Sequence, residues 1–152
     1  KMDRVGADFA VVIEQIGQRL AMRPAALQLP IGAENEHEGV IDLLRMRAFT
    51  FTGEESNPPI EGDVPASMLD AATAAREALI ETVADVDDEI ADRFLEGAEI
   101  DAETLRKAIR RACLAVKLVP VLAGAALRNM GVQLLLDAVV DYLPAPTEVP
   151  PV

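Results

Sequence analysis

The chain has 152 residues, enough for one compact domain with a sizeable core, or for one domain and part of another. Hydrophobic residues make up 51% and charged residues 26%, which excludes disorder of the whole chain. Aromatic residues are only 3% and the net charge is −12, so the composition argues against a nucleic-acid-binding surface. It favours a basic protein partner, or simple solubility.

The chain carries no sign of a membrane or secreted protein. A single cysteine, Cys113, excludes an intramolecular disulfide and fits a reducing compartment, so we expect a cytoplasmic location. No apolar run approaches the length of a membrane helix, and no signal-peptide pattern opens the chain. Because the first residue is Lys1 rather than methionine, we expect a fragment of a longer protein, and a monomer.

The first half of the chain predicts one helix followed by extended segments. Apolar residues at a spacing of three and four indicate the helix, and Pro24 ends it. Alternation of Leu44, Met46 and Ala48 with arginines indicates a strand, and a break in this alternation near Ile41 suggests a β-bulge. The predicted elements are a helix over 8–20, an extended segment over 25–31, a strand over 40–51 and a loop over 52–65.

The second half predicts mostly helices. They are a helical region over 66–96 broken near Asp87, a helix capped by Asp101 and reaching 116, a buried strand over 118–122, a loop over 124–129, a helix over 132–143 and a proline-rich exit over 144–152. Gly97 is expected to end the first helical region. The residues expected to face the core are Leu69, Ala72, Leu79, Val83, Val86, Ile90 and Phe94, then Leu105, Ala108, Ile109, Ala112 and Val116, and finally Leu135, Leu136, Val139 and Val140.

This order of elements predicts an α/β protein. The two ends are expected to be pieces of one layered α/β structure, and residues 25–116 a separate α+β insertion between them.

Residues with catalytic chemistry are sparse. His37, the only histidine, lies in a polar stretch and is expected to be a solvated loop residue, and Cys113 is expected to be a structural, unreactive thiol. One histidine and one cysteine cannot close a zinc site. The chain contains neither a P-loop nor a dinucleotide-binding glycine motif, so it carries no phosphate-binding loop of its own.

Several stretches together resemble one family. They are KMDRVGADF at the start, LQLPIGAE followed by EGVIDLL, the helix end RFLEG, and GVQLLLDAVVDYLPAP near the end. The whole chain resembles bacterial translation elongation factor G, from its guanine motif N-K-x-D, here without the asparagine, to the end of the GTPase domain.

The resemblance implies a fold and a function. Residues 1–24 and 117–143 would be the C-terminal part of a Ras-like P-loop GTPase domain, 25–116 its inserted α+β subdomain with a mixed sheet packed by helices, and 144–152 the linker to the next domain. The parent protein would be a GTP hydrolase that promotes ribosomal translocation of tRNA and mRNA. GTP or GDP with Mg²⁺ would bind the complete protein, whereas this fragment alone would bind no nucleotide and be inactive.

The resemblance also implies residue roles in recognising guanine. Asp3 matches the aspartate that accepts the N–H groups of guanine N1 and N2, and Lys1 matches the lysine whose stem packs over the base. Ala126 matches the residue whose backbone N–H meets guanine O6, with Ala125 and Leu127 beside it. Ala125 stands where the family has a serine, so the hydroxyl expected to brace the loop is missing.

Negative charge is concentrated between Arg76 and Glu103. Eleven acidic residues lie in this stretch, and within it only Arg76 and Arg93 oppose them. At helical spacing the acids fall on one line, opposite the apolar side chains, and such stacking destabilises a helix. The acids predicted to share this line are Glu77, Glu81, Asp85, Asp88 and Asp92.

The resemblance implies a partner for this acidic face. Glu81, Asp85 and Asp88 match positions that contact the basic C-terminal domain of the ribosomal stalk protein. A solvated outer face remains the simpler interpretation. Two other functions stay open: a related ribosomal GTPase, such as a ribosomal protection protein or a release-factor GTPase, and a stand-alone acidic protein-binding module.

Overall fold

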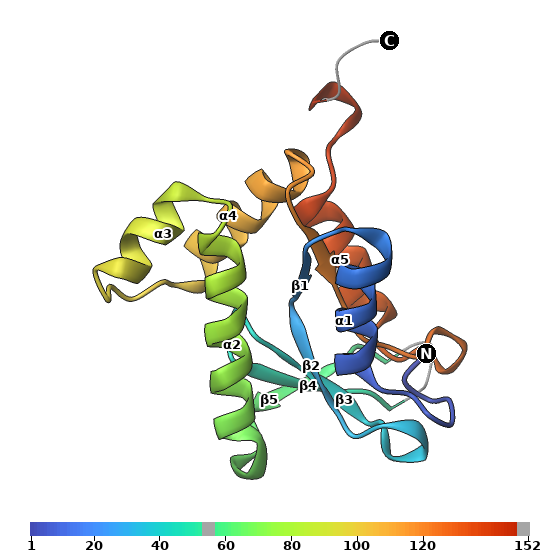
Figure 1. Ribbon diagram of the computed structural model, residues 1–152. Helices are drawn as coiled ribbons and strands as arrows, with labels where there is room; N and C mark the ends of the chain where they lie inside the picture. The colour runs from blue at the N-terminus through green and yellow to red at the C-terminus, as the bar shows by residue number, and fades with distance from the viewer. Residues whose placement is uncertain (53–56, 149–152) are drawn as a thin grey trace.

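The computed structural model describes residues 1–52 and 57–148, and within them it shows a mixed α/β fold (Figure 1). The strands are β1 (Pro24–Ala26), β2 (Gln28–Ile31), β3 (Gly39–Asp42), β4 (Arg47–Thr50), β5 (Ile60–Asp63) and β6 (Val119–Val121). The helices are α1 (Phe9–Leu20), α2 (Leu69–Ala84), α3 (Asp88–Leu95), α4 (Ala102–Leu114) and α5 (Val132–Tyr142). Short 3₁₀ turns cover Glu34–Glu36, Ala66–Met68, Ala126–Arg128 and Pro146–Glu148. The predicted α/β class is confirmed.

The strands form two sheets that meet at Leu27. β1 and β6 pair in parallel, and β2, β3, β4 and β5 form an antiparallel sheet in that order. The Leu27 N–H donates to the Val121 carbonyl at 3.0 Å, and the Leu27 carbonyl accepts from the Leu43 N–H at 3.0 Å. A strand is therefore confirmed within 118–122, but the prediction that it is buried is wrong, because all three residues of β6 are half-buried. The extended segment over 25–31 divides into two strands that belong to different sheets.

The single long strand predicted over 40–51 is wrong, because the segment is a hairpin. One Asp42 side-chain oxygen accepts the N–H groups of Leu44 and Arg45 at 2.8 and 3.0 Å, which turns the chain. Met46 completes the turn with a φ of 52°. The apolar turn residue Leu43 is buried in the core, so the turn does not look polar in the sequence. The described part of the predicted loop over 52–65 also contains a strand, β5.

Aspartate side chains cap three helix starts, and the predicted cap at Asp101 is confirmed. The Asp8 side chain accepts the Val11 N–H at the start of α1, and the Asp101 side chain accepts the Thr104 N–H at the start of α4. The predicted break near Asp87 is confirmed, because the Asp87 side chain caps α3 through the Ile90 N–H. The last four residues of the predicted exit segment, 149–152, lie outside the described residues.

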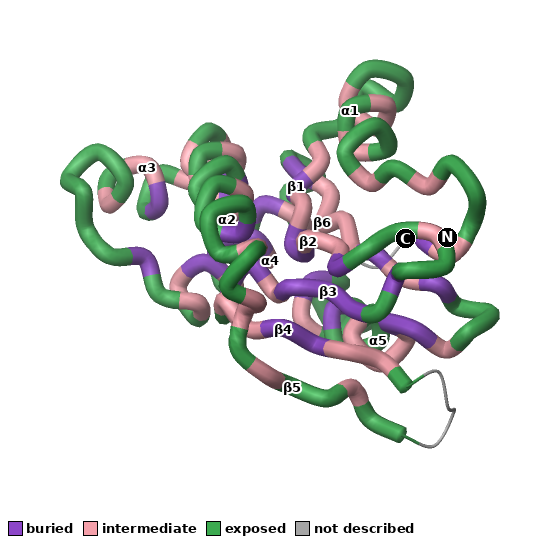
Figure 2. The backbone as a smooth tube through the Cα atoms, turned by 90° about the horizontal axis from the view of Figure 1, so that it is seen from below, coloured by how far each residue is buried: buried purple, intermediate pink, exposed green. Residues whose placement is uncertain are grey.

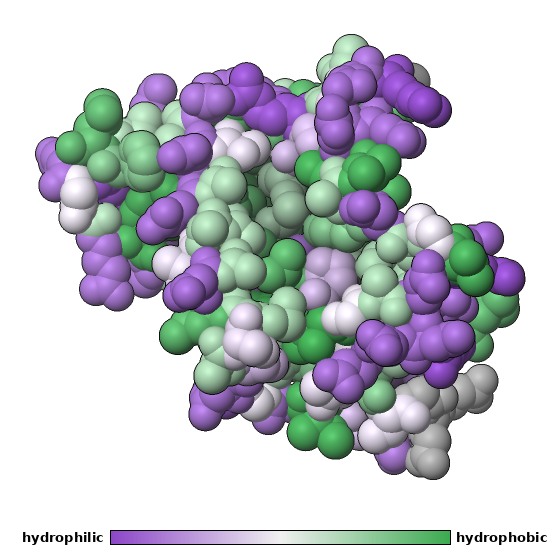
Figure 3. Space-filling model, turned by 60° about the horizontal axis from the view of Figure 1, so that its bottom comes forward, coloured by the Kyte–Doolittle hydropathy of each residue, from purple (hydrophilic) through white to green (hydrophobic). Residues whose placement is uncertain are grey.

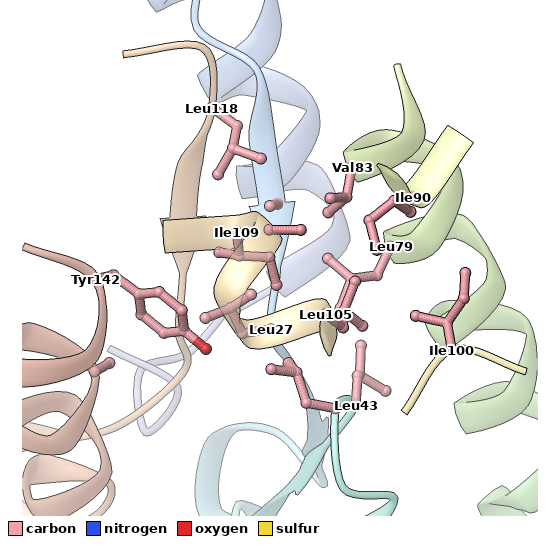
Figure 4. Packing of buried hydrophobic residues seen from close by; sticks show 14 of the residues in the cluster. Leu27, Leu43, Leu79, Val83, Ile90, Ile100, Leu105, Ile109, Leu118 and Tyr142 are labelled. Atoms are coloured by element: carbon pink, nitrogen blue, oxygen red, sulfur yellow. The ribbon is translucent and has the colours of Figure 1, made fainter. Parts of the chain in front are cut away.

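The main core lies between α4 and the elements around it. Figure 4 shows Leu105 and Ile109 of α4 at its centre, with Leu79 and Val83 of α2 on one side and Tyr142 of α5 on the other. Both α4 side chains have no exposed surface. Figure 2 shows buried residues along β3 and β4 as well, so the antiparallel sheet packs on the same centre.

The prediction of the inward face of α5 is wrong. Ala138 and Tyr142 are the buried residues of this helix, and each lies between an aspartate and an exposed apolar residue. The residues predicted to be inside are exposed: Leu135 (50%), Leu136 (60%), Val139 (43%) and Val140 (79%). The helix is apolar around most of its circumference, so spacing alone does not select the side that packs.

Other predicted core positions are also exposed. Leu69 and Phe94, the first and last residues of their predicted apolar stripe, are 50% and 43% exposed. Val116 lies past the end of α4 at a φ of 56°, and its side chain is exposed. The remaining predicted positions of α2, α3 and α4 are buried or half-buried.

Candidate functional site

A backbone hydrogen bond holds the first residues of the chain against the loop after β6. The Met2 N–H donates to the Gly124 carbonyl at 3.0 Å. The Met2 side chain is buried with Val40, Phe49 and Ala123. Segments from opposite ends of the sequence therefore lie side by side, as Figure 1 shows near the N-terminus.

The loop after β6 is closed by its own backbone. Ala125 and Met130 exchange two hydrogen bonds of 2.9 and 3.2 Å, and the Arg128 N–H donates to the Ala125 carbonyl at 2.9 Å. At Gly124 a Cβ atom would lie only 2.7 Å from the Met130 carbonyl oxygen, so the close approach requires glycine. The main chain thus braces the loop without a side-chain hydroxyl at position 125.

The predicted guanine-binding residues lie on these two segments. Lys1, Ala126 and Leu127 are exposed, Asp3 is half-buried, and Ala125 is buried. Among the described residues, the Asp3 carboxylate has no hydrogen bond or ion pair, and no backbone carbonyl accepts the Ala126 N–H. An acceptor-only group and a backbone donor are therefore both available on one side of the molecule, and guanine requires both kinds of group.

The prediction that His37 is a solvated loop residue is wrong. The ring is 2% exposed, and its Nδ1 atom lies 3.4 Å from the Gly32 carbonyl oxygen. The Nε2 atom has no partner among the described residues. Burial lowers the pKa of His37, although the Gly32 and Ile31 carbonyls oppose the shift, so the ring is neutral at pH 7.

A second candidate site is a groove between α2 and α3, of about 560 Å³. Its residues are Ala78, Glu81, Thr82, Ala84, Asp85, Ala91, Phe94 and Leu95. Phe94 and Leu95 are exposed. Figure 3 shows that hydrophobic residues lie among hydrophilic ones on the surface of the molecule. The groove thus combines an apolar lining with two carboxylates, Glu81 and Asp85, which suits a partner that is both apolar and basic.

The prediction that the acidic residues share one straight line is wrong. The chain leaves the helix at Asp85 and Asp87, so Asp88 and Asp92 belong to α3 and point along a different axis. The three predicted partner-binding residues, Glu81, Asp85 and Asp88, are nevertheless all exposed or half-buried at the surface. Among the described residues, Glu81 and Asp88 have no ion pair.

Arginines from elsewhere in the chain offset part of the acidic charge. Arg23 pairs with Asp85 at 2.6 Å, and Arg111 bonds Asp87 and Glu89 at 2.9 Å each. Burial alone would raise the pKa of Asp87, but the Arg111 guanidinium and the Ile90 N–H together hold it below its ordinary value. Counting charge within the stretch 76–103 misses these arginines, because both lie outside it in the sequence.

A larger groove, of about 590 Å³, is lined by residues of α5, α4 and the β3–β4 hairpin. Asp42 and Tyr142 line it, and burial raises the pKa of both groups. Burial also raises the pKa of the nearby Cys113 thiol, which is typical of an unreactive cysteine.

Among residues 1–52 and 57–148, no group of three His, Cys, Asp or Glu side chains could hold a metal ion. No helix of that part of the chain combines the length and the apolar composition needed to cross a bilayer.

No family model matches the chain. Among solved structures, it is similar to a protein of Thermus thermophilus known from its crystal structure, with a TM-score of 0.78 and 28% sequence identity. The likeness covers 94% of this chain and 21% of that chain. The chain therefore spans about a fifth of the length of that protein, and the arrangement of its α/β elements also occurs within a longer polypeptide.

Proposed function

We propose that the chain is a segment of a translational GTPase of the elongation factor G type, and that its two ends together recognise guanine. The observation that carries the proposal is the Met2–Gly124 hydrogen bond, which joins the segment of Asp3 to the loop of Ala126. These segments are the two that resemble the family's guanine motifs. In this proposal residues 1–24 and 117–143 belong to a Ras-like GTPase domain, and 25–116 to its insertion.

The free groups fit the edge of a guanine base. The Asp3 carboxylate would accept the N1 and N2 hydrogens, and the Ala126 N–H would donate to O6. Adenine has an acceptor at N1 and would leave the carboxylate unpaired, which penalises the wrong base. The stem of Lys1 would cover the ring. The Mg²⁺ ion and the phosphate-binding loop would belong to other parts of the complete protein, where GTP hydrolysis takes place.

The isolated chain is expected to bind guanine nucleotides too weakly to measure. It offers contacts to the base only, whereas glycine loops and helix N-termini supply much of the affinity for phosphates. Isothermal titration calorimetry with GDP tests this expectation. A dissociation constant in the micromolar range would contradict the assignment of the phosphate contacts to another part of the protein.

In the complete protein, Asp3→Asn is expected to shift preference from guanine to xanthine nucleotides. The asparagine amide presents N–H donors to guanine's own donors, whereas xanthine carries an oxygen at that position. Competition between GTP and xanthosine triphosphate measures the change, with Asp8→Asn as a control outside the base site. Unchanged discrimination in Asp3→Asn would overturn the role of this carboxylate.

A second candidate function is the binding of a basic protein by the groove between α2 and α3. The apolar lining flanked by Glu81 and Asp85 favours it. In a translational GTPase the partner would be the basic C-terminal domain of the ribosomal stalk protein. The same groove would serve a stand-alone acidic binding module, and a phosphate-binding loop encoded upstream of Lys1 would distinguish the two.

A further inference from the structure

Glu34 holds the N-terminal segment at two points. It lies in the loop between β2 and β3, and its backbone N–H donates to the Met2 carbonyl at 2.7 Å. Its side-chain Oε1 accepts the Gly6 N–H, also at 2.7 Å. The two bonds lie on either side of Asp3 in the sequence, so a single residue fixes the backbone before and after that carboxylate.

The backbone at Glu34 adopts a conformation that favours glycine, so the presence of a glutamate side chain at this position needs an explanation. Its φ is 57°, in the left-handed region where glycine is favoured and a glutamate is strained. Glycine could supply the bond to the Met2 carbonyl, because that bond uses only the main chain. Among the described residues, the hydrogen bond from the Gly6 N–H to the Glu34 carboxylate is the one hydrogen bond at this position that glycine could not form.

The loop that carries Glu34 is anchored to the core. The Glu38 N–H donates to the Ile31 carbonyl at 3.1 Å, and the Phe51 N–H donates to the Glu38 carbonyl at 2.9 Å. The ring of His37, the residue before Glu38, is buried and packs near Phe51, with ring centres 6.4 Å apart. Through its two hydrogen bonds, Glu34 therefore holds the N-terminal segment in a fixed position relative to this anchored loop.

We propose that Glu34 is a positioning residue for base recognition. The Asp3 carboxylate forms no hydrogen bond or ion pair among the described residues, so the backbone on both sides of it largely determines where it lies. Glu34 sets that backbone, and the Met2–Gly124 bond sets its distance from the loop of Ala126. This inference rests on the proposed function, because Asp3 needs a fixed position only if it binds a ligand.

The first test uses this chain and needs no nucleotide. Glu34→Gly removes the carboxylate and relieves the strained backbone, so the fold is expected to survive. Loss of one hydrogen bond should raise the hydrogen-exchange rate of the Gly6 amide about threefold to tenfold. Glu34→Gln keeps an acceptor oxygen and should restore most of the protection. Glu36→Gly removes an exposed carboxylate from the same loop and is the control. A Gly6 exchange rate unchanged by Glu34→Gly would overturn the inference.

The second test uses the complete protein and compares GDP affinity in the same variants. Glu34→Gly is expected to weaken binding about threefold to tenfold, with recovery in Glu34→Gln and no change in Glu36→Gly. If Asp3→Asn alters base preference while Glu34→Gly leaves affinity unchanged, guanine recognition stands and the positioning role is overturned. If Asp3→Asn has no effect, the proposed function fails and the positioning role fails with it, even where the Gly6 contact is confirmed.

Discussion

Reversal of Glu81, Asp85 and Asp88 to lysine is expected to abolish binding of this chain to a basic partner. All three side chains reach the surface, and Glu81 and Asp85 line the groove between α2 and α3. Opposite charges at such a surface accelerate association and fix orientation, whereas like charges in contact repel. Binding by the original chain should be weak, fast and strongly reduced by salt, because exposed charges are screened within about 8 Å at physiological ionic strength.

An NMR titration at low salt with the isolated basic C-terminal domain of the ribosomal stalk protein measures this binding. Shifts are expected at the amides of α2 and α3 that line the groove, including Phe94. Shifts confined to other parts of the chain, or equal binding by the triple variant, would contradict the proposed docking surface.

The matched control reverses Glu14, Asp70 and Asp137, three acids away from the groove. It changes the net charge by the same amount and should leave binding nearly intact at moderate salt. Asp70 lies in the first turn of α2, as Asp88 does in α3, so both triples carry a similar penalty from a lysine at a helix N-terminus. A difference in binding between the two triple variants therefore depends on the position of the charges rather than on their number.

Arg76→Ala is expected to destabilise the fold by about 2–4 kcal/mol, because one guanidinium serves three carbonyl groups. The Arg76 side chain donates to the carbonyls of Leu43 and Leu44 at 2.6 and 2.5 Å, and to that of Ile100 at 2.7 Å. It thereby ties α2 to the β3–β4 hairpin and to the segment before α4. Truncation leaves these carbonyls without their charged donor, and alanine cannot replace any of the bonds.

Urea unfolding followed by circular dichroism measures the loss. Arg76→Lys should be intermediate, since an ammonium group cannot reach three carbonyls with the geometry of a guanidinium. Arg93→Ala is the control, because among the described residues the Arg93 side chain forms only an i,i+4 ion pair with Glu89 at 3.4 Å, and such pairs contribute about 0.3–0.5 kcal/mol. Equal stability of the Arg76 and Arg93 alanine variants would contradict the central role of Arg76.

The residues of the candidate guanine site could be predicted only from the resemblance to a family. How the two segments of the site come together could not be predicted from the sequence. Lys1-Met2-Asp3 is a common triplet, and the loop at 124–129 has no distinctive side chain. The bond that unites them joins backbone atoms of Met2 and Gly124, and backbone bonds leave no side-chain pattern to read. The role of Glu34 was equally hidden, since the residue lies 28 positions from Gly6 in the sequence.

Local features of the fold were determined by the sequence itself. Asp8, Asp87 and Asp101 cap three helices through bonds to N–H groups three residues ahead, so each start depends only on neighbouring residues. The apolar stripe of α4 is equally local, because Leu105, Ala108, Ile109 and Ala112 share one face at helical spacing and all are buried.

Tertiary structure decided which of several locally possible arrangements is adopted. α5 is apolar on more than one side, and its packing against α4 selected Ala138 and Tyr142 over the larger exposed leucines and valines. The alternating segment that predicted one long strand is a hairpin instead, because the Asp42 side chain stabilises a turn whose leucines enter the core. Pairing partners such as Arg23 for Asp85 were set in the same way, since a contact between distant segments depends on where the whole chain places them.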